Sequence, residues 1–420
     1  MSTASITKYY TDRTPASAAE YRRAGGVLAG GNSRQSVFWR PYPLTLERAD
    51  GCHVWDLDGN GYIDLLNNYT ALVHGHNYPP VVAAVEQQIR DGSCWAAACA
   101  EQVDLAEQIV ERISSVEQVR FVNSGTEAAN LALTVARTIT GRDAVLMARH
   151  GYHGSLVEFE SGHTNRPFAM TRLAEFNNTA DFQQVLSEHG SEIAAVFLEP
   201  VLGAGGIIPG DQKFFTSVAE ATRAAGALFV MDEVLTFRLA TGGLQKAFGL
   251  EPDMTMLGKF IGGGYPVGAV GGSREIMKVF DPDTGTIFHG GTFNGNPITM
   301  AAGAVSLAEL TDERIAKMDA LAQRLRTGLL SAAAAAGLPL TINCVGSIMN
   351  LHFTDNEAAP AAHRSAAQML APFHLAALNR GVFIAPRGLI ALSSVMSEAL
   401  IDDALERCEA AMLDVAGESR

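Results

Sequence analysis

The chain is poor in cysteine, and this shortage excludes two kinds of stabilised small fold. Five of its 420 residues are cysteine, an odd number at irregular spacing: Cys52, Cys94, Cys99, Cys344 and Cys408. A disulfide framework needs paired cysteines, and a zinc site needs ligands at short, regular spacing. We therefore expect reduced thiols, with neither disulfides nor a bound metal.

Positive charge and long apolar runs are lacking as well. The chain has 31 lysine and arginine residues against 45 aspartate and glutamate residues, a net charge of −14, and no run of basic residues. A nucleic-acid-binding protein needs a basic surface, so we exclude that class. No uninterrupted apolar stretch reaches the roughly 18 residues of a membrane-spanning helix. The N-terminal MSTASITKYYTDRT lacks the apolar core of a signal peptide, so we expect a soluble, cytoplasmic protein.

Several ligand-binding motifs are absent or imperfect. The string DLDGNGYID, 56–64, resembles a calcium loop, but its twelfth position is Asn67 instead of glutamate, and its flanks look like strands. We predict a β-hairpin with a Gly-Asn-Gly turn there. Gly258-Lys259 is followed by Phe260 where a phosphate loop needs serine or threonine. No nucleophile elbow or GxGxxG after a strand is present, so kinase and hydrolase functions lack their motifs.

The middle of the chain alternates short apolar runs with helical periods. QVRFVNSG, AVLMARH, IAAVFLEP and ALFVMDEV are typical of buried strands. Helical spacing follows the first run and places four apolar residues on one side: Ala128, Leu131, Val135 and Ile139. This alternation predicts an α/β fold with a mostly parallel sheet between helices. Ligands of such sheets bind at the carboxyl ends of strands, which are marked here by Ser124, Glu199 and Asp232.

The length of the chain and a change of pattern predict two domains. With 420 residues, of which 47% are hydrophobic, the chain is long for a single core. After residue 305, a long helical pattern, short strands and a last helix replace the alternating pattern. We therefore expect a large ligand-binding domain over 61–305 and a smaller α+β domain over 306–420, which the N-terminal segment 1–60 joins.

The stretch TMLGKFIGGGYPVGAVGG places one amine, Lys259, among seven glycines. Glycines let a backbone and a cofactor approach closely, and a lysine shielded from water becomes a nucleophile; a solvated surface lysine is the alternative. Asp232, 27 residues earlier, ends a very apolar strand. A buried acid there is costly unless it is paired. It either caps a neighbouring loop or contacts a protonated ring nitrogen, and the spacing allows both side chains to enter one pocket.

Two further segments complete the set. In NSGTEA, Ser124, Gly125 and Thr126 lie where a strand meets a helix, which indicates either an anion site or a plain helix cap. In HGYHG, Tyr152 is either an ordinary loop residue or a ring that stacks on a flat cofactor. A phosphate anchor, an acid, an amine and a stacking ring together match the needs of pyridoxal 5′-phosphate.

Over nearly its full length the chain resembles the class III aminotransferases, which are fold type I pyridoxal-phosphate enzymes. Six motifs in the same order carry the resemblance: FVNSGTEAAN, GYHG, FLEPVLGAGGIIP, LFVMDEVLTFR, TMLGKFIGGGYPVGAVGG and GGTFNGNPITMAAG. The resemblance implies a fold type I architecture, with a large domain that binds the cofactor and a smaller domain built from both termini.

The resemblance also implies roles for individual residues. Lys259 is then the lysine that binds the cofactor as a Schiff base, and Asp232 is the partner of the pyridinium nitrogen. Gly125 and Thr126 contact the phosphate, and Tyr152 covers the ring face.

The string GGTFNGNP bears on assembly. In the family its threonine, Thr292 here, reaches the phosphate of the cofactor in the neighbouring subunit. The resemblance therefore implies a homodimer with shared active sites.

Within the family, the chain is similar to β-amino acid aminotransferases, such as the β-phenylalanine enzymes, and to glutamate-1-semialdehyde 2,1-aminomutase. The strings NSRQSVFWRPYPLT and FIAPRGLIALS resemble the former. They offer Arg34, and second Arg387, as the arginines that bind substrate carboxylates, since guanidinium pairs bidentately with carboxylate. The alternative for Arg34 is a surface loop arginine. Nearby Phe38, Trp39 and Tyr42 either border a side-chain pocket or pack in the core.

We therefore expect an aminotransferase that moves an amino group from an amino acid to a 2-oxo acid such as 2-oxoglutarate or pyruvate. The expected donor is a β-amino acid such as β-phenylalanine. An aminomutase-type isomerase is the alternative enzyme, and a non-catalytic scaffold that retains the motifs is the alternative class.

Overall fold

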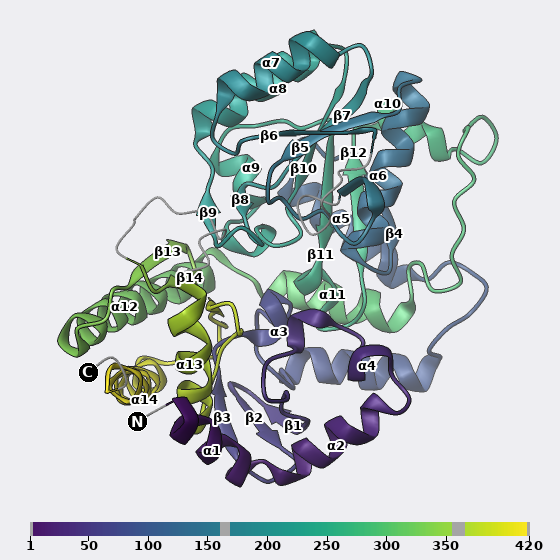
Figure 1. Cartoon of the computed structure of the whole chain (residues 1–420). Coiled ribbons are helices and arrows are strands. Elements are labelled where there is room, and N and C mark those ends of the chain that lie inside the picture. The colour runs from purple at the N-terminus through teal and green to yellow at the C-terminus, as the bar shows by residue number, and fades with distance from the viewer. Residues whose placement is uncertain (1–2, 160–168, 355–365, 418–420) are drawn as a thin grey trace. The chain divides into compact units, whose positions relative to one another are not determined.

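The structure is a computed structural model that describes residues 3–159, 169–354 and 366–417. The chain forms two compact units (Figure 1). The large unit comprises residues 79–312, and the small unit combines residues 1–78 with residues 313–420. The assignment of cofactor binding to the segment 61–305 stays a prediction.

A seven-stranded sheet forms the centre of the large unit. Its strand order is β4 (Gln118–Val122), β12 (Gly268–Gly272), β11 (Met254–Gly258), β10 (Leu228–Asp232), β7 (Ile193–Leu198), β5 (Ala144–Ala148) and β6 (Thr171–Ala174). Strand β12 is antiparallel to both of its neighbours, whereas the other strand pairs are parallel. The mostly parallel sheet that the sequence predicts is therefore confirmed.

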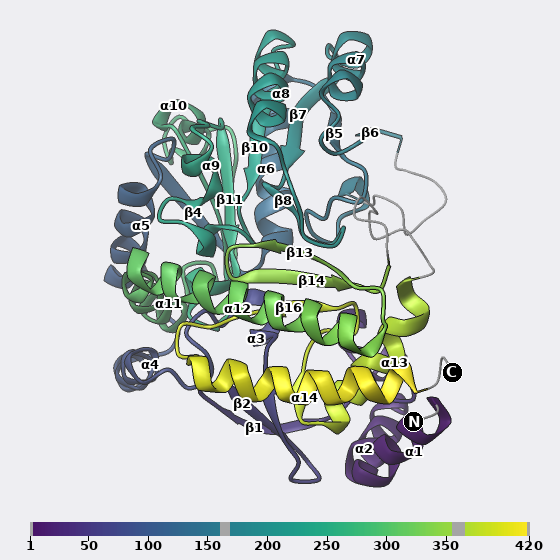
Figure 2. The same ribbon diagram turned by 90° about the vertical axis from the view of Figure 1, so that its left-hand side faces the viewer.

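Helices cover both faces of this sheet, which explains why its strands are continuously apolar. In β5, Val145 and Met147 join a core with α6 (Gly125–Thr140), whereas Leu146 joins a second core. That second core includes α7 (Thr179–His189) and α8 (Gln212–Ala224), which lie side by side (Figure 2). Successive strand residues point to opposite faces, and each finds an apolar layer.

The helix expected after the first apolar run is α6, and its apolar side is buried over only part of its length. Ala128, Leu131 and Val135 are buried. Ile139 is 42% exposed, because the buried part of the helix ends at Ala136 and Ile139 lies in the last turn.

Among its described residues, the large unit also contains further α-helices, short strands and 3-10 turns. They are α4 (Pro79–Asp91), α5 (Ala100–Arg112), η3 (Val157–Phe159), β8 (Val201–Leu202), β9 (Ile208–Pro209), η4 (Phe237–Leu239), α9 (Gly243–Ala247), η5 (Lys259–Gly262), α10 (Arg274–Met277), η6 (Lys278–Phe280) and α11 (Pro297–Glu309). Helix α11 packs on η5, the turn that begins at Lys259. At Gly303 the approach is close, since a Cβ there would lie 2.1 Å from Ile261 O.

The small unit contains two sheets. The first has the order β1 (Leu46–Asp50), β2 (His53–Asp56), β3 (Gly61–Asp64) and β15 (Val382–Phe383). The second has the order β13 (Thr341–Val345), β14 (Ile348–His352) and β16 (Leu389–Ala391). Because β15 pairs with β3, both ends of the chain contribute to one sheet. The fold is thus an α/β large unit with a smaller α+β unit built from both termini.

The helices of the small unit come from both chain segments. They are α1 (Thr3–Arg13), α2 (Pro15–Gly25), η1 (Ala29–Gly31), η2 (Gln35–Val37), α3 (Asn67–Thr70), α12 (Asp312–Ala336), α13 (Ala366–Asn379) and α14 (Glu398–Ala416). Helices α12 and α14 lie side by side (Figure 2), and Arg324 on α12 pairs with Asp402 on α14 at 2.7 Å.

Two alternatives from the sequence are resolved in this unit. The calcium-like string forms the predicted β2–β3 hairpin, in which Asp56 accepts hydrogen bonds from Asn60 N (2.8 Å) and Tyr62 Oη (2.6 Å). Trp39 and Tyr42 pack with the core of the small unit. Trp39 Nε1 also donates to Tyr10 Oη at 3.1 Å. Core packing therefore accounts for Trp39 and Tyr42.

All five cysteines are free thiols, as predicted. Within the described ranges, no helix is long and apolar enough to cross a membrane. Among the same residues, no cluster of histidine, cysteine and acidic side chains suits a metal ion.

Substitution of Gly303 by alanine tests the close packing of α11 on the Lys259 turn. The added Cβ would overlap Ile261 O, and backbone cannot move aside as a flexible side chain can. We expect Gly303→Ala to lower the free energy of unfolding by about 2 kcal/mol or more, measured by chemical denaturation.

Gly25→Ala is the matched control, because Gly25 is also helical and nothing lies within 4 Å of the position that a Cβ would take there. It should be neutral or stabilise the protein by up to about 1 kcal/mol. Equal effects of the two substitutions would contradict the close approach.

Candidate active site

Four of the predicted site segments lie at one edge of the large sheet. Ser124 follows β4, Glu199 follows β7, Asp232 ends β10 and Lys259 follows β11. These strands run in the same direction, so their carboxyl ends meet at one edge. Asp232 is in register with Met256 of β11, three residues before Lys259. The structure therefore brings the acid and the lysine segment to neighbouring strands.

Asp232 is a buried acid with two protein partners. The residue is 5% exposed. Oδ1 accepts a hydrogen bond from Val234 N at 3.0 Å, and Oδ2 shares one with His153 Nδ1 at 2.8 Å. His153 is itself buried, and its Nε2 has no hydrogen-bond partner within the described structure. The acid thus caps the following loop, and it also holds a histidine ring.

Sequence reasoning missed His153. It singled out Tyr152 from HGYHG for its ring and left the adjacent histidine without a role. The signal was available in principle, because a buried Asp232 requires a donor, and histidine is a common partner for carboxylate.

Glu199 fixes the loop that carries Tyr152. Its carboxylate accepts hydrogen bonds from Tyr152 N at 3.1 Å and from Gly203 N at 3.0 Å. Burial raises the pKa of Glu199 to about 7, while the nearby His153 acts in the opposite direction. Tyr152 is 51% exposed. Its backbone is therefore anchored, while the aromatic face remains available to a ligand.

The first turn of α6 combines a helix cap with a candidate anion site. Ser124 Oγ accepts a hydrogen bond from Glu127 N at 3.1 Å, so the cap alternative is present. The amides of Gly125 and Thr126 belong to the first turn, where an α-helix offers no internal acceptor. Thr126 Oγ1 accepts from Ser155 N at 3.2 Å, which ties this turn to the loop after Tyr152.

Val234 joins the α6 turn to the lysine segment. A Cβ at Gly125 or at Gly258 would lie 3.3 Å from Val234 Cγ1 in both cases. The side chain therefore occupies the space between the two glycines, and sequence reasoning had not singled it out. Lys259 has φ of +54°, which is unusual for a residue with a Cβ. Such backbone strain persists where surrounding contacts enforce it.

Thr292 lies in an exposed segment. Phe288 and Phe293 nearby are 99% and 59% exposed. Asn294 anchors the segment, since its Oδ1 accepts a hydrogen bond from Asn123 Nδ2 at 2.8 Å. The expected reach of Thr292 to a neighbouring subunit stays a prediction.

Both candidate substrate arginines belong to the small unit, and they flank one tyrosine. Arg34 Nη1 donates to Asn68 Oδ1 at 3.0 Å. Arg387 Cζ lies 6.0 Å from the centre of the Tyr69 ring, and the Tyr69 hydroxyl donates to Ser36 O. Burial raises the pKa of Tyr69, while the positive charges of Arg387 and Arg34 oppose that shift. The structure thus places the two arginines around neighbouring residues of one turn.

That turn is α3, and its backbone is left-handed. Four consecutive residues have positive φ: Asn67 (50°), Asn68 (48°), Tyr69 (57°) and Thr70 (76°). This conformation costs roughly 1–2 kcal/mol per residue for residues other than glycine. Buried hydrogen bonds support it, from Asn67 Nδ2 to Ala391 O (2.7 Å) and from Asn67 N to Asp64 Oδ1 (3.0 Å).

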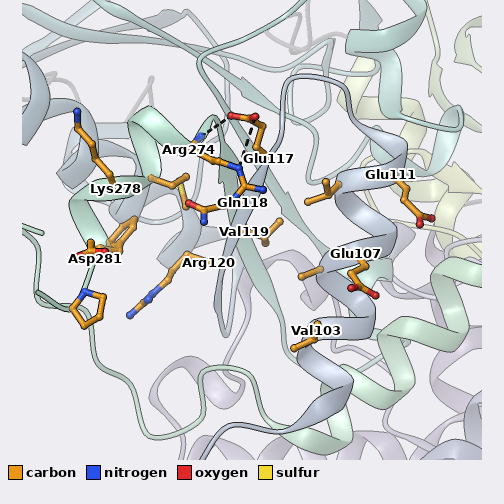
Figure 3. A pocket seen from close by; sticks show the side chains of 15 residues that line it. Val103, Glu107, Glu111, Glu117, Gln118, Val119, Arg120, Arg274, Lys278 and Asp281 are labelled. Atoms are coloured by element: carbon orange, nitrogen blue, oxygen red, sulfur yellow. Dashed lines mark hydrogen bonds and ion pairs between the residues drawn. The ribbon is translucent and has the colours of Figure 1, made fainter. Parts of the chain in front are cut away.

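A hollow of about 910 Å³ lies elsewhere in the large unit, beside β4 and between α5 and α10 (Figure 3). Charges of both signs line it, and Arg274 N donates to Glu117 Oε2 at 2.8 Å. Among the described residues that line the hollow, none is a predicted site residue. We do not assign it to the candidate active site.

Comparison with known proteins identifies the class. The family model for class-III aminotransferases matches residues 36–412. The chain therefore belongs to the class-III aminotransferase family, and it is a pyridoxal-phosphate-dependent transaminase of fold type I.

Two curated relatives and one solved structure illustrate the similarity. A beta-phenylalanine transaminase of Variovorax paradoxus is 38% identical, over 94% of this chain and 92% of that protein. A glutamate-1-semialdehyde 2,1-aminomutase of Aquifex aeolicus is also 38% identical, over 94% of this chain and 99% of that protein. A transaminase solved with pyridoxal phosphate bound superposes with a TM-score of 0.91 at 33% identity, covering 96% and 99% of the two chains.

The described residues fit this cofactor. The first-turn amides of α6 suit a phosphate, and buried Asp232, already bonded to His153, suits a protonated ring nitrogen. Glycines at 125 and 258 keep the walls beside Val234 free of side chains. A half-exposed Tyr152 ring and the Lys259 amine complete the set.

The buried Glu233, next to Asp232, gives a prediction about pH. Its Oε1 accepts a hydrogen bond from Gln245 N at 2.7 Å, and burial raises its pKa to about 7. An unfolded glutamate titrates near about 4.3. The folded state therefore prefers the protonated acid, so this contribution to stability is complete below about pH 4.3 and is lost as the pH rises through about 7.

Glu233→Gln removes this titration. The free energy of unfolding of the wild type minus that of Glu233→Gln should fall by roughly 2–3 kcal/mol between about pH 5 and about pH 8. Denaturant titrations across that range measure the difference, with Glu220→Gln on exposed α8 surface as the control for the substitution itself. A difference that does not change with pH would show that Glu233 is not protonated by burial.

Proposed function

We propose that the chain transfers an amino group from a β-amino acid, such as β-phenylalanine, to a 2-oxo acid, such as 2-oxoglutarate or pyruvate. The observation that carries the proposal is the grouping of Arg34 and Arg387 at neighbouring residues of one turn in the small unit, Asn68 and Tyr69. A 2-oxo acid and a β-amino acid present their carboxylates at different distances from the reacting carbon. Two guanidinium groups on one structural support suit such a pair of substrates.

The resemblance of the N-terminal segment to β-phenylalanine aminotransferases supports the same donor. So does the 38% identity to a beta-phenylalanine transaminase across 94% of this chain. Arg34 is our first choice for the donor carboxylate, and Arg387 is the second arginine.

The proposed roles in the large unit follow from its chemistry. Pyridoxal phosphate, when bound, supplies an electron-withdrawing ring that stabilises negative charge on the adjacent substrate carbon. Lys259 would hold the cofactor covalently through its amine, and the same amine, once free, would act as the base that removes a proton from the amine-bearing carbon of the substrate. Asp232, supported by His153, keeps the ring nitrogen protonated. Ser124, Gly125 and Thr126 bind the phosphate, and Tyr152 covers the ring.

We also propose a homodimer with shared sites. The exposed Phe288 and Phe293 beside Thr292 support this, because large exposed aromatic side chains are typical of interfaces. In this assembly Thr292 contacts the cofactor phosphate of the partner.

An aminomutase-type isomerase is the second candidate, supported by the equal identity to a glutamate-1-semialdehyde aminomutase. An isomerase rearranges a single substrate and needs no separate acceptor. The requirement for a 2-oxo acid therefore distinguishes the two functions.

A donor panel tests the proposed function. The donors are the two enantiomers of β-phenylalanine, α-phenylalanine, and glutamate 1-semialdehyde. We expect one β-phenylalanine enantiomer to exceed each of the other donors at least about tenfold in kcat/KM. Turnover should require pyruvate or 2-oxoglutarate, measured as formation of the aminated acceptor. Turnover of glutamate 1-semialdehyde alone, without an acceptor, would favour the isomerase instead.

Lys259→Ala tests the covalent attachment. Borohydride reduction of the wild-type protein should fix the cofactor on the chain, which intact-mass spectrometry detects as an added mass. Lys259→Ala should show no such addition, because alanine has no amine to bind the cofactor. Lys278→Ala, on a side chain that is 61% exposed, should behave like the wild type. An unchanged addition in Lys259→Ala would move the attachment to another lysine.

A further inference from the structure

We propose that Asn68 is a positioning residue that holds the Arg34 guanidinium ready for a substrate carboxylate. This inference rests on the proposed role of Arg34 and adds a residue that acts only through it. The direct observation is the hydrogen bond of 3.0 Å from Arg34 Nη1 to Asn68 Oδ1.

The arginine needs such support because it is exposed on a loop. A long, flexible side chain that lacks a fixed partner populates several rotamers, and ligand binding must then restrict it. Arg34 N is already held by Asn32 Oδ1 at 2.9 Å, which fixes the backbone but leaves the guanidinium to be oriented. Asn68 supplies the contact at the far end of the side chain.

The chemistry of the partner matters. A neutral amide oxygen takes one of the five N–H donors of the guanidinium and leaves others for a bidentate carboxylate pair. It also leaves the positive charge of Arg34 uncompensated. An acidic residue at the same place would form an ion pair and compete with the substrate. Asn68 therefore orients the cation without neutralising it.

Hydrogen bonds of neighbouring buried residues fix the position of Asn68. The left-handed turn that carries it, α3, follows Asp64, whose Oδ1 accepts hydrogen bonds from Leu66 N (2.8 Å) and Asn67 N (3.0 Å). His76 Nε2 bonds Asp64 Oδ2 at 2.7 Å. Asn67 Nδ2 is bonded to Ala391 O in the core. Buried hydrogen bonds thus hold the turn that carries Asn68, and Asn68 in turn binds the exposed guanidinium of Arg34.

Tyr69 adds a second tie between the turn and the arginine loop. Its hydroxyl donates to Ser36 O, two residues after Arg34. The turn thus contacts the arginine loop at two points. Tyr69 binds the backbone of the loop at Ser36, and Asn68 binds the guanidinium of Arg34. A right-handed turn of the same sequence would project these consecutive side chains in other directions. The strained backbone therefore directs Asn68 and Tyr69 toward the arginine loop.

Asn68→Gly tests the inference without backbone strain, because glycine adopts positive φ freely. The probe is 3-phenylpropanoate, which has the carboxylate of β-phenylalanine but no amine and so cannot react. Calorimetry on the holoenzyme should show that Asn68→Gly raises its Kd about three- to tenfold. In the half-reaction with β-phenylalanine, KM should rise by a similar factor while kcat changes little. The matched amine without a carboxylate, 1-phenylethylamine, should be unaffected.

Asn77→Gly is the matched control. Asn77 is another exposed asparagine of the small unit at positive φ, 49°, and its amide donates to Ala49 O. Its replacement should leave the Kd of 3-phenylpropanoate unchanged. Asn68→Asp keeps both the acceptor and the tolerance of positive φ, but its charge should weaken binding further than Asn68→Gly does.

Arg34→Ala separates the two proposals. It should raise the Kd of 3-phenylpropanoate at least about tenfold, and Asn68→Gly should have no further effect in that background. If Arg34→Ala weakens binding while Asn68→Gly does not, the inference is overturned and the role of Arg34 stands. If Arg34→Ala leaves binding unchanged, the role of Arg34 fails, and the inference fails with it. A full effect of Asn68→Gly in the Arg34→Ala background, or wild-type affinity in Asn68→Asp, also overturns it.

Discussion

The hydrogen bond between Asp232 and His153 is the interaction on which the large unit depends. A buried carboxylate at the end of an apolar strand destabilises a fold unless donors satisfy it. His153 comes from the loop after β5, and Asp232 ends β10, with β7 between them in the sheet. Glu199, after β7, bonds the Tyr152 amide. The ends of three adjacent strands are thereby joined through two acids, and an edge of polar loops becomes a fixed surface.

Close backbone approaches make this surface rigid. A Cβ at Gly268 would lie 2.0 Å from Ser124 O, and one at Gly303 would lie 2.1 Å from Ile261 O. The first contact sets β12 against the turn that starts α6, and the second sets α11 against the turn that starts at Lys259. Because backbone rather than flexible side chain forms both contacts, the candidate phosphate turn and the candidate lysine have little freedom. A cofactor enzyme needs such pre-arranged groups, since misplacement of a reacting atom is costly.

The small unit carries the candidate substrate arginines on a turn with a strained backbone. Its two candidate arginines are proposed to bind carboxylates, a role that requires their charge to stay accessible and not neutralised. The structure instead places strain in the left-handed turn 67–70 and supports that turn by buried hydrogen bonds to Asp64 and Ala391. The turn then presents Asn68 and Tyr69 to the arginine side chains. The unfavourable free energy of this arrangement is that of the left-handed backbone, and the guanidinium charge stays available to a ligand.

The sequence by itself determined the alternation of strands and helices, the position of Ser124, Glu199 and Asp232 at strand ends, and the family. Periodicity and motif spacing carry these properties, because each depends on residues close together in the chain. Ile139 has the same helical spacing as the buried Leu131 and Val135 but is exposed, because a helical period does not reveal where a helix passes beyond the core. Only the tertiary structure decided that His153 partners Asp232, that Trp39 and Tyr42 belong to the core, and that Asn68 holds Arg34. The bond between Arg34 and Asn68 joins positions 34 residues apart, and the bond between His153 and Asp232 joins positions 79 residues apart. The left-handed turn follows from burial and pairing with distant backbone, which no local pattern encodes.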